Sequence, residues 1–398
     1  MRVWYFSEMA YHPAWDEGLK RGSLRVIYPN GQVDPQMAHK LLNRYLDEFA
    51  YCDEAGLDIM VNEHHATATC MTVSVPMALA IIARETKTAR LLSLGNPIAN
   101  RPDPVRVAEE MAWLDVLSGG RLEMGLVKGA PYEIHPANSN PARLMRRYWE
   151  AHDLILKALS TTDGPFSWEG EYFQYRAVNI WPRPIQQPTP PVWMTGLSVD
   201  SGIAAAERGH VIGTLLSGSV AKPMFDAYRK RAAELGRHAT PDRFAYAACI
   251  GVGQTREEGL RRAHLIADYV RPAPVVHEPF TNPPGYNSIN ANVGMLKAGP
   301  AGKAFVKDRK GNAVDHRTAT VEQFMETDTV FAGTPDDVYE QIKSFHDRIG
   351  GFGHLLFFGQ GGHIDHKDTM DNIRLFAREV MPRLKDLSAD EARRTAAE

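Results

Sequence analysis

Two adjacent histidines at the end of a short apolar run are the residues of this sequence best suited to chemistry. The run reads Asp-Ile-Met-Val-Asn-Glu-His-His and extends from Asp58 to His65. If it forms a strand of a parallel barrel, its C-terminal end lies where barrel enzymes hold their catalytic groups. Side chains alternate along a strand, so only one of His64 and His65 can face the barrel mouth. The structural alternative is that one imidazole packs beneath a helix and the other caps a loop.

A metal site is the weaker interpretation of these histidines. Glu63-His64-His65 lacks the i, i+4 histidine spacing of helical zinc sites. His363 and His366 flank Asp365 in a Gly-rich stretch without a further cluster of ligands, so we expect them to be loop histidines. The sequence therefore predicts no metal site.

Two other segments have the residue types of an anion site. Lys128-Gly129 follows an apolar run and places a cation beside a flexible backbone. The segment Gly196-Leu197-Ser198-Val199-Asp200-Ser201 precedes an Ala-rich helix, and hydroxyls with free N–H groups at a helix start bind phosphate. A solvated lysine and ordinary helix capping by Ser198 or Asp200 explain the same residues. Together the two segments indicate a phosphorylated cofactor.

Known nucleotide and nucleophile motifs are missing from the sequence. The Gly-rich stretches at 350–353 and 359–362 lack the strand–turn–helix context of a dinucleotide fingerprint, a Walker loop or a nucleophile elbow. We interpret them as turns.

Apolar runs alternate with amphipathic stretches from end to end, which is typical of βα units around a parallel sheet. Eight such units predict an α/β fold of the (β/α)8 TIM-barrel type. The predicted strands are Val3–Phe6, Leu57–Val61, Leu91–Gly95, Leu122–Leu126, Val192–Thr195, Val211–Leu215, Phe244–Gly251 and His354–Phe358.

Helix starts are marked by capping residues. Asp34, Asp103 and Asn140 each precede a proline, which suits the first helical position. Thr255 and Glu258 form a capping box, and Thr334 is a cap that is followed by an acidic first turn.

A barrel of about 250 residues leaves about 150 of the 398 residues for long connections. We expect insertions after strands 1, 4 and 7, at Tyr11–Asp34, Asp163–Pro191 and 271–329. Residues 1–398 are predicted to form a single domain. The insertion at 271–329 shows little periodicity and is a candidate active-site lid.

Composition excludes several classes of protein. The net charge of -3 lacks the basic bias of a nucleic-acid-binding protein. Cys52, Cys70 and Cys249 are too few and too widely spaced for a disulfide framework, which favours a cytoplasmic protein. The sequence shows neither a signal peptide nor an apolar stretch of about 20 residues that could span a bilayer.

Four local patterns, in order along nearly the whole chain, resemble the bacterial luciferase family of flavin-dependent monooxygenases. They are Glu63-His64-His65, the stretch Gly120-Arg121-Leu122-Glu123-Met124-Gly125-Leu126-Val127-Lys128-Gly129, Pro191-Val192-Trp193, and Leu375-Phe376-Ala377-Arg378-Glu379-Val380-Met381-Pro382. Two positions depart from the family pattern, since Val127 stands where luciferase has a reactive cysteine and Leu197 replaces an acidic residue.

The resemblance implies roles for individual residues. His64 takes the place of the catalytic histidine beside the flavin, and Lys128 that of a phosphate-binding arginine. Ser198 and Ser201 match hydroxyls that hold the FMN phosphate, within a turn that includes Gly196 and Leu197. Asn96 contributes to the cofactor site, and the Asn96-Pro97 bond falls where family members often have a cis peptide.

The resemblance also implies an activity and its partners. Reduced FMN, delivered by a separate flavin reductase, would react with O2 to form a flavin hydroperoxide that oxygenates a small organic substrate. A homodimer is the expected assembly. The alternatives are a deazaflavin-dependent dehydrogenase or reductase on the same barrel, and a non-catalytic flavin-binding subunit.

Overall fold

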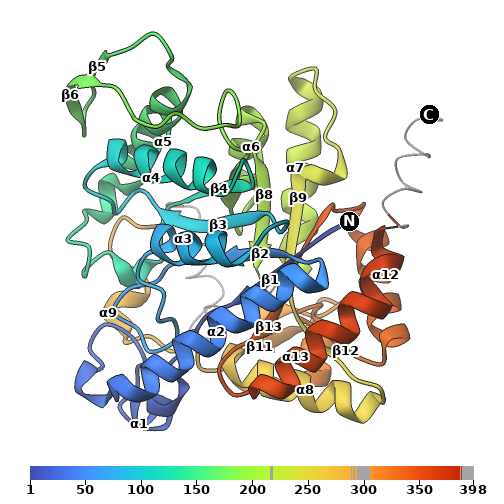
Figure 1. Ribbon diagram of the computed structural model, residues 1–398. Coiled ribbons are helices and arrows are strands. Elements are labelled where there is room, and N and C mark those ends of the chain that lie inside the picture. Colours follow the sequence, from blue (N-terminus) through green and yellow to red (C-terminus); the bar gives the residue numbers. More distant parts are fainter. Residues whose placement is uncertain (216–217, 288, 290–291, 294–304, 386, 388–398) are drawn as a thin grey trace.

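Eight parallel strands close into a barrel with helices on its outside (Figure 1). This computed structural model describes residues 1–215, 218–287, 289, 292–293, 305–385 and 387. Around the barrel the order is β1-β2-β3-β4-β7-β8-β9-β13, and β13 pairs with β1 to close the ring. The strands are β1 (Arg2–Ser7), β2 (Asp58–Val61), β3 (Leu91–Pro97), β4 (Leu122–Val127), β7 (Val192–Thr195), β8 (Val211–Leu215), β9 (Phe244–Val252) and β13 (His354–Gln360). The predicted TIM barrel is confirmed.

The helices begin where the sequence predicts capping. Asp34, Asp103, Thr255 and Thr334 each accept a hydrogen bond from a backbone N–H of the first turn. Asn140 instead caps a short helix, η4 (Pro141–Arg143), that leads into α5. The main helices are α2 (Pro35–Ala55), α3 (Val75–Glu85), α4 (Pro104–Leu117), α5 (Leu144–Ser160), α6 (Val199–Arg208), α7 (Gly218–Glu234), α8 (Arg256–Val270), α12 (Pro335–Ile349) and α13 (His366–Leu375). No helix in the described ranges is long and apolar enough to cross a bilayer.

Alternate residues of each strand divide the core into two layers. Trp4 and Trp193 belong to the inner cluster, whereas Tyr5 packs outward against Phe49 of α2. The rings of Trp4 and Trp193 meet edge to face at 5.5 Å. Their indole N–H groups donate to His354 Nδ1 at 3.1 Å and to Glu123 Oε2 at 2.6 Å. The barrel interior is therefore filled by aromatic groups whose polar atoms are satisfied.

The three insertions carry small elements of their own. The first contains α1 (Trp15–Lys20), and the second contains a hairpin of β5 (Phe166–Glu169) and β6 (Gln174–Val178) that projects at the upper left of Figure 1. In the third, positions 288, 290–291 and 294–304 lie outside the described residues. Its described elements are α9 (Glu278–Thr281), β10 (Phe305–Lys307), β11 (Ala313–Asp315) and α11 (Val321–Glu326).

One strand of the sheet was not predicted. β12 (Val330–Gly333) pairs in parallel with the end of β9, with Val330 opposite Cys249 and Gly333 opposite Val252. Four residues of mixed size are too short to show a strand period. Pairing with β9 holds this segment in an extended conformation.

Candidate active site

The predicted site residues lie at one rim of the barrel. β2, β3, β4 and β7 are consecutive neighbours, and the strands are parallel. His64 follows β2, Asn96 is near the end of β3, Lys128 follows β4, and Ser198 follows β7. Because the C-terminal ends of neighbouring parallel strands meet at the same edge, these residues share the catalytic face of the barrel.

The two histidines are on a loop rather than on a strand. β2 ends at Val61, where the strand was predicted to end, so strand alternation does not apply to His64 and His65. The loop is held by the backbone N–H of His64, which donates to Thr72 O at 3.1 Å. The imidazoles have different partners. His64 Nδ1 lies 3.0 Å from Glu133 Oε1, and His65 Nε2 lies 2.9 Å from Glu63 Oε1.

Glu63 organises the outer half of this loop. Its buried carboxylate accepts from Arg101 Nη2 at 2.7 and 2.8 Å and from the N–H of Val75, the first residue of α3, at 2.8 Å. A buried carboxylate with an arginine and a helix start as partners is well compensated. Glu63 therefore holds the side chain of His65, and His64 is the histidine that we expect to act at the barrel rim.

Glu133 sets the protonation state of His64. Burial lowers the pKa of His64, but the hydrogen bond and the charge of Glu133 outweigh it, so the pKa is raised above 6.5. Burial raises the pKa of Glu133, but its bond to His64 and the N–H of Ala130 outweigh this, so that pKa is lowered. The pair therefore favours an imidazolium facing a carboxylate. Nε2 of His64 has no hydrogen-bond partner within the described part of the chain.

Tyr132 and Glu133 contact His64, and the sequence did not reveal either contact. Both belong to a short helix, η3 (Pro131–Glu133), just after Lys128-Gly129. The Tyr132 hydroxyl lies 2.8 Å from His64 Nδ1. These contacts join residues 68 and 69 positions apart, and no spacing in the sequence marks them.

Lys128 is covered by the third insertion. Its Nζ lies 3.6 Å from the centre of the Tyr286 ring and donates to Tyr286 O at 3.3 Å. Burial lowers the pKa of Lys128 from 10.5 to about 8. No carboxylate pairs with this ammonium group in the described ranges. A buried cation without an acid fits an anionic ligand.

The turn after β7 forms a helix start of the expected kind. Ser198 caps α6, with its Oγ 3.3 Å from the N–H of Ser201 and 3.0 Å from Ser201 Oγ. A Cβ on Gly196 would lie 2.3 Å from Ser201 Cβ, so this close approach requires glycine. Leu197 is 67% exposed. Ser198 therefore does cap α6, as the alternative interpretation of this turn proposed. The other N–H groups of the first turn stay available to an anion.

The cis peptide is not at Asn96-Pro97, and that prediction is wrong. The non-prolyl bond Leu94-Gly95 is cis instead, where the register of β3 against β4 shifts. A Cβ on Gly95 would lie 2.3 Å from Val127 Cγ1, so the two strands approach too closely there for a larger residue.

Several buried polar atoms at this rim have no partner. They are Asn96 Nδ2, both side-chain polar atoms of Asn100 and Thr214 Oγ1. Asn96 Oδ1 accepts from Arg101 Nε at 3.4 Å, whereas its amide nitrogen is unsatisfied. Buried groups of this kind are normally bonded. With the Ser198 turn and Lys128, they fit a heteroaromatic cofactor that carries a phosphate.

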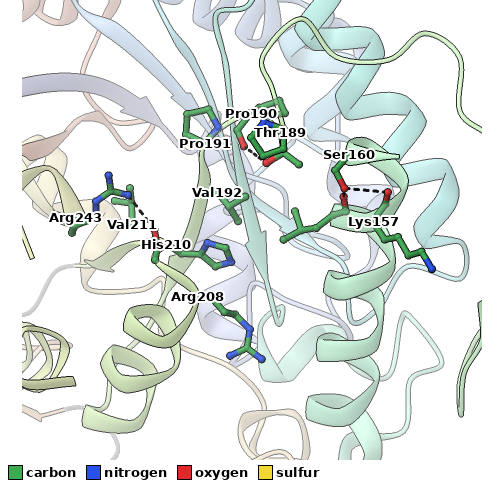
Figure 2. Close-up of a pocket in the computed structure, with 13 residues that line it drawn as sticks. Lys157, Ser160, Thr189, Pro190, Pro191, Val192, Arg208, His210, Val211 and Arg243 are labelled. Atoms are coloured by element: carbon green, nitrogen blue, oxygen red, sulfur yellow. Dashed lines mark hydrogen bonds between the residues drawn. The ribbon is translucent and has the colours of Figure 1, made fainter. Parts of the chain in front are cut away.

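A separate cavity of about 490 Å3 lies at the opposite end of the barrel (Figure 2). It is lined by Val192 and Val211, at the starts of β7 and β8, and by His210. His210 Nε2 is bonded to His152 Nε2 at 2.8 Å, and Arg243 donates to Gly209 O at 3.0 Å. The catalytic face of barrel enzymes is the other end. We therefore do not assign chemistry to this cavity.

The sequence matches the model of the luciferase-like monooxygenase family over residues 26–350. The oxygenase component of a flavin-dependent trigonelline monooxygenase from Acinetobacter baylyi is 28% identical over 181 residues, which cover 44% of this chain and 49% of that protein. The alkanal monooxygenase alpha chain of the Kryptophanaron alfredi symbiont is 23% identical over 383 residues, 93% of this chain and 99% of that one. Across its matches at 27 to 31% identity, the chain spans about half the length of the curated relatives.

Solved structures share the fold. The oxygenating constituent of 3,6-diketocamphane monooxygenase from Pseudomonas putida, a type II Baeyer-Villiger enzyme in complex with FMN, has a TM-score of 0.67 at 20% identity and covers 87% of this chain and 94% of its own. An F420-dependent secondary alcohol dehydrogenase has a TM-score of 0.63 at 15% identity, over 95% of this chain and 98% of its own. The family model matches residues 26–350, and the barrel and the order of its rim residues agree with that match. This chain therefore belongs to the luciferase-like monooxygenase family.

Proposed function

We propose that this protein is the oxygenase component of a two-component FMN-dependent monooxygenase that acts on a small organic substrate. The observation that carries the proposal is the His64–Glu133 pair on the rim that also holds Lys128 and the Ser198 turn. When bound, reduced FMN would supply the electrons that activate O2. A relative named as an oxygenase component supports a separate flavin reductase as partner.

The chain's own residues would bind the cofactor and move a proton. The phosphate would take Lys128 and the start of α6, with Gly196, Leu197, Ser198 and Ser201 in the turn. Asn96 would supply an amide donor, since its Nδ2 is unsatisfied. His64 would present Nε2 toward the reacting atoms, and Glu133 would hold its proton on Nδ1.

Replacement of His64 tests this function. His64→Ala should bind FMN as the wild type does and lose product formation by about 100-fold or more, which is the usual contribution of a general acid–base group. Activity would be measured with a generic flavin reductase and mass spectrometry of a panel that includes aldehydes, ketones and trigonelline. His65→Ala is the matched control and should retain most turnover, because His65 is bonded to Glu63 instead. Wild-type turnover in His64→Ala would remove His64 from the mechanism.

We also propose that the insertion at 271–329 is a lid over the cofactor site. Three contacts of described residues support this role. Phe280 packs edge to face on His135 at 4.8 Å, Gly285 lies against Ala142, and Tyr286 covers Lys128. A lid here would exclude water from the reaction.

Assembly and compartment complete the proposal. A homodimer is supported by exposed apolar side chains on the packed helices α3 and α4. A cytoplasmic location is supported by Cys52, Cys70 and Cys249, which are all free and buried.

A second candidate is a deazaflavin-dependent dehydrogenase, because an F420-dependent enzyme shares the fold over 95% of this chain. The two functions differ in their use of oxygen. Mixing the protein with reduced FMN or reduced deazaflavin, with and without O2, distinguishes them by absorbance. Oxygen-dependent oxidation coupled to substrate only with FMN is the expected result.

A further inference from the structure

An arginine of the first insertion lies almost fully buried at the catalytic rim. Arg25 is 7% exposed and belongs to the loop after β1. It forms an isolated β-bridge with Thr67 of the loop after β2. Its backbone N–H donates to Ser23 Oγ at 3.1 Å, and the next N–H, of Val26, donates to Ala66 O at 2.6 Å. Two loops therefore hold Arg25 in place.

The guanidinium group is close to the proposed proton-transfer residues. Its carbon lies 4.2 Å from the centre of the Tyr132 ring. The hydroxyl of the same tyrosine lies 2.8 Å from His64 Nδ1. Arg25 and His64 are thus linked through a single side chain.

The guanidinium group of Arg25 has no hydrogen-bond acceptor among the described residues. Nε is buried and unsatisfied, and no hydrogen bond or ion pair of the guanidinium group exists in the described part of the chain. Burial acts to lower the pKa of Arg25, but Tyr132, Tyr269 and Glu8 outweigh it, so the group stays charged. The site therefore contains a permanent buried cation.

The neighbouring carboxylates are engaged elsewhere. Glu8 accepts from Asn62 Nδ2 at 2.8 Å. Glu133 binds His64 and the N–H groups of His65 and Ala130. The charges of Glu8 and Glu133 favour the cation from a distance, and the ring of Tyr132 lies against it. None of these groups accepts a guanidinium N–H in the described part of the chain, so those donors are available to a ligand.

We infer that Arg25 binds a carboxylate group of the substrate and that the natural substrate is an organic acid. The inference rests on the proposed function, since it places that acid beside His64. The planar fork of a guanidinium group matches the two oxygens of a carboxylate. The proposed phosphate site lies after β4 and β7, whereas Arg25 lies in the loop after β1 and bridges to the loop after β2. Tyr132 provides a flat apolar face beside the cation.

Paired acids and amides test the inference by binding alone. Benzoate and benzamide, nicotinate and nicotinamide, and octanoate and octanamide would be titrated calorimetrically into the full chain, with and without FMN. At least one acid should bind at least tenfold more tightly than its amide. Arg25→Met should reduce that preference to within twofold and leave FMN affinity unchanged. Arg25→Lys should give an intermediate preference, because it keeps the charge and loses the fork.

Arg208→Met is the matched control, because Arg208 also stacks on an aromatic ring, at 3.6 Å from Trp149, but at the other end of the barrel. It should keep the full preference for acids. A second readout is the melting temperature of Arg25→Met without ligand, which reports whether the variant remains folded.

Two results would overturn the inference. One is that no acid binds better than its amide, and the other is that Arg25→Met keeps the preference. A lower melting temperature with unchanged preference would likewise show that Arg25 is structural. If instead the acids bind as expected but the protein lacks flavin-dependent turnover, the proposed function fails and the Arg25 site stands.

Discussion

At the scale of single residues, the hydrogen bond between His64 and Glu133 raises the pKa of the imidazole. Burial alone lowers the pKa of an imidazole, and Glu133 reverses that effect. His64 thus keeps its proton at pH values where a histidine with a pKa of 6.5 begins to lose it.

Glu133→Gln should lower the pKa of His64 below 6.5, because burial then acts without the opposing carboxylate. His64 is charged below its pKa, so the pH range in which it is an imidazolium should move to lower pH. NMR titration of the imidazole and the pH profile of kcat/KM would both report the shift. Tyr132→Phe, which removes a hydroxyl and no charge, should shift both curves less. Identical profiles for wild type and Glu133→Gln would contradict the assignment.

At the scale of elements, the third insertion contacts the segment after β4 that we assign to the cofactor site. Tyr286 closes over Lys128 with its ring and carbonyl, and its hydroxyl donates to Gly129 O at 2.7 Å. We therefore expect Tyr286 to limit how strongly water solvates Lys128, the cation that we assign to the phosphate.

Wild-type affinity for FMN should fall as the pH rises through about 8, because Lys128 loses its charge there. The loss should be about tenfold, the usual worth of a charge-assisted hydrogen bond. In Tyr286→Ala the lysine is solvated and its pKa should return toward 10.5, so affinity should stay constant between about pH 7 and 9. Quenching of FMN fluorescence would measure these affinities.

The control for this prediction is Tyr286→Phe, which keeps the ring over Lys128 and should keep the pH dependence. Lys128→Met should bind FMN weakly and without pH dependence across the same range. A wild-type affinity that does not change with pH would show that Lys128 does not contact the phosphate.

At the scale of the whole molecule, the exposed apolar residues of α3 and α4 are where we expect a second copy to pack. Met77 and Ile81 on α3 and Trp113 and Val116 on α4 are all exposed, and the two helices pack against each other. Exposed apolar groups of this size on neighbouring helices are typical of interfaces.

Trp113→Glu combined with Met77→Glu should convert a dimer to a monomer, since burial of two carboxylates at the interface is unfavourable. Light scattering after size-exclusion chromatography would measure the mass. Leu235→Glu is the control, because Leu235 is 41% exposed and follows α7, which packs mainly against α6 and α12. A wild-type protein that is monomeric at micromolar concentration would rule out the dimer.

At this largest scale, the pattern of the sequence was enough to predict the fold and the enzyme class. The eight predicted strands all occur within one or two residues of their expected bounds, and the family match confirms the recognition and the oxidoreductase class. Local physics explains this success, because an apolar run or a capping residue acts within one element. β12 escaped prediction because its extended form depends on β9, which lies about 80 residues earlier.

The sequence by itself determined which residue types stand at the barrel rim, since strand order and capping are encoded locally. It did not determine which of them touch. Glu133 reaches His64 across 69 positions, Tyr286 reaches Lys128 across 158, and the cis bond lies at Leu94-Gly95 rather than at Asn96-Pro97. Only the closed barrel decides such contacts, because they depend on how distant loops pack and on which buried charges are left without a partner.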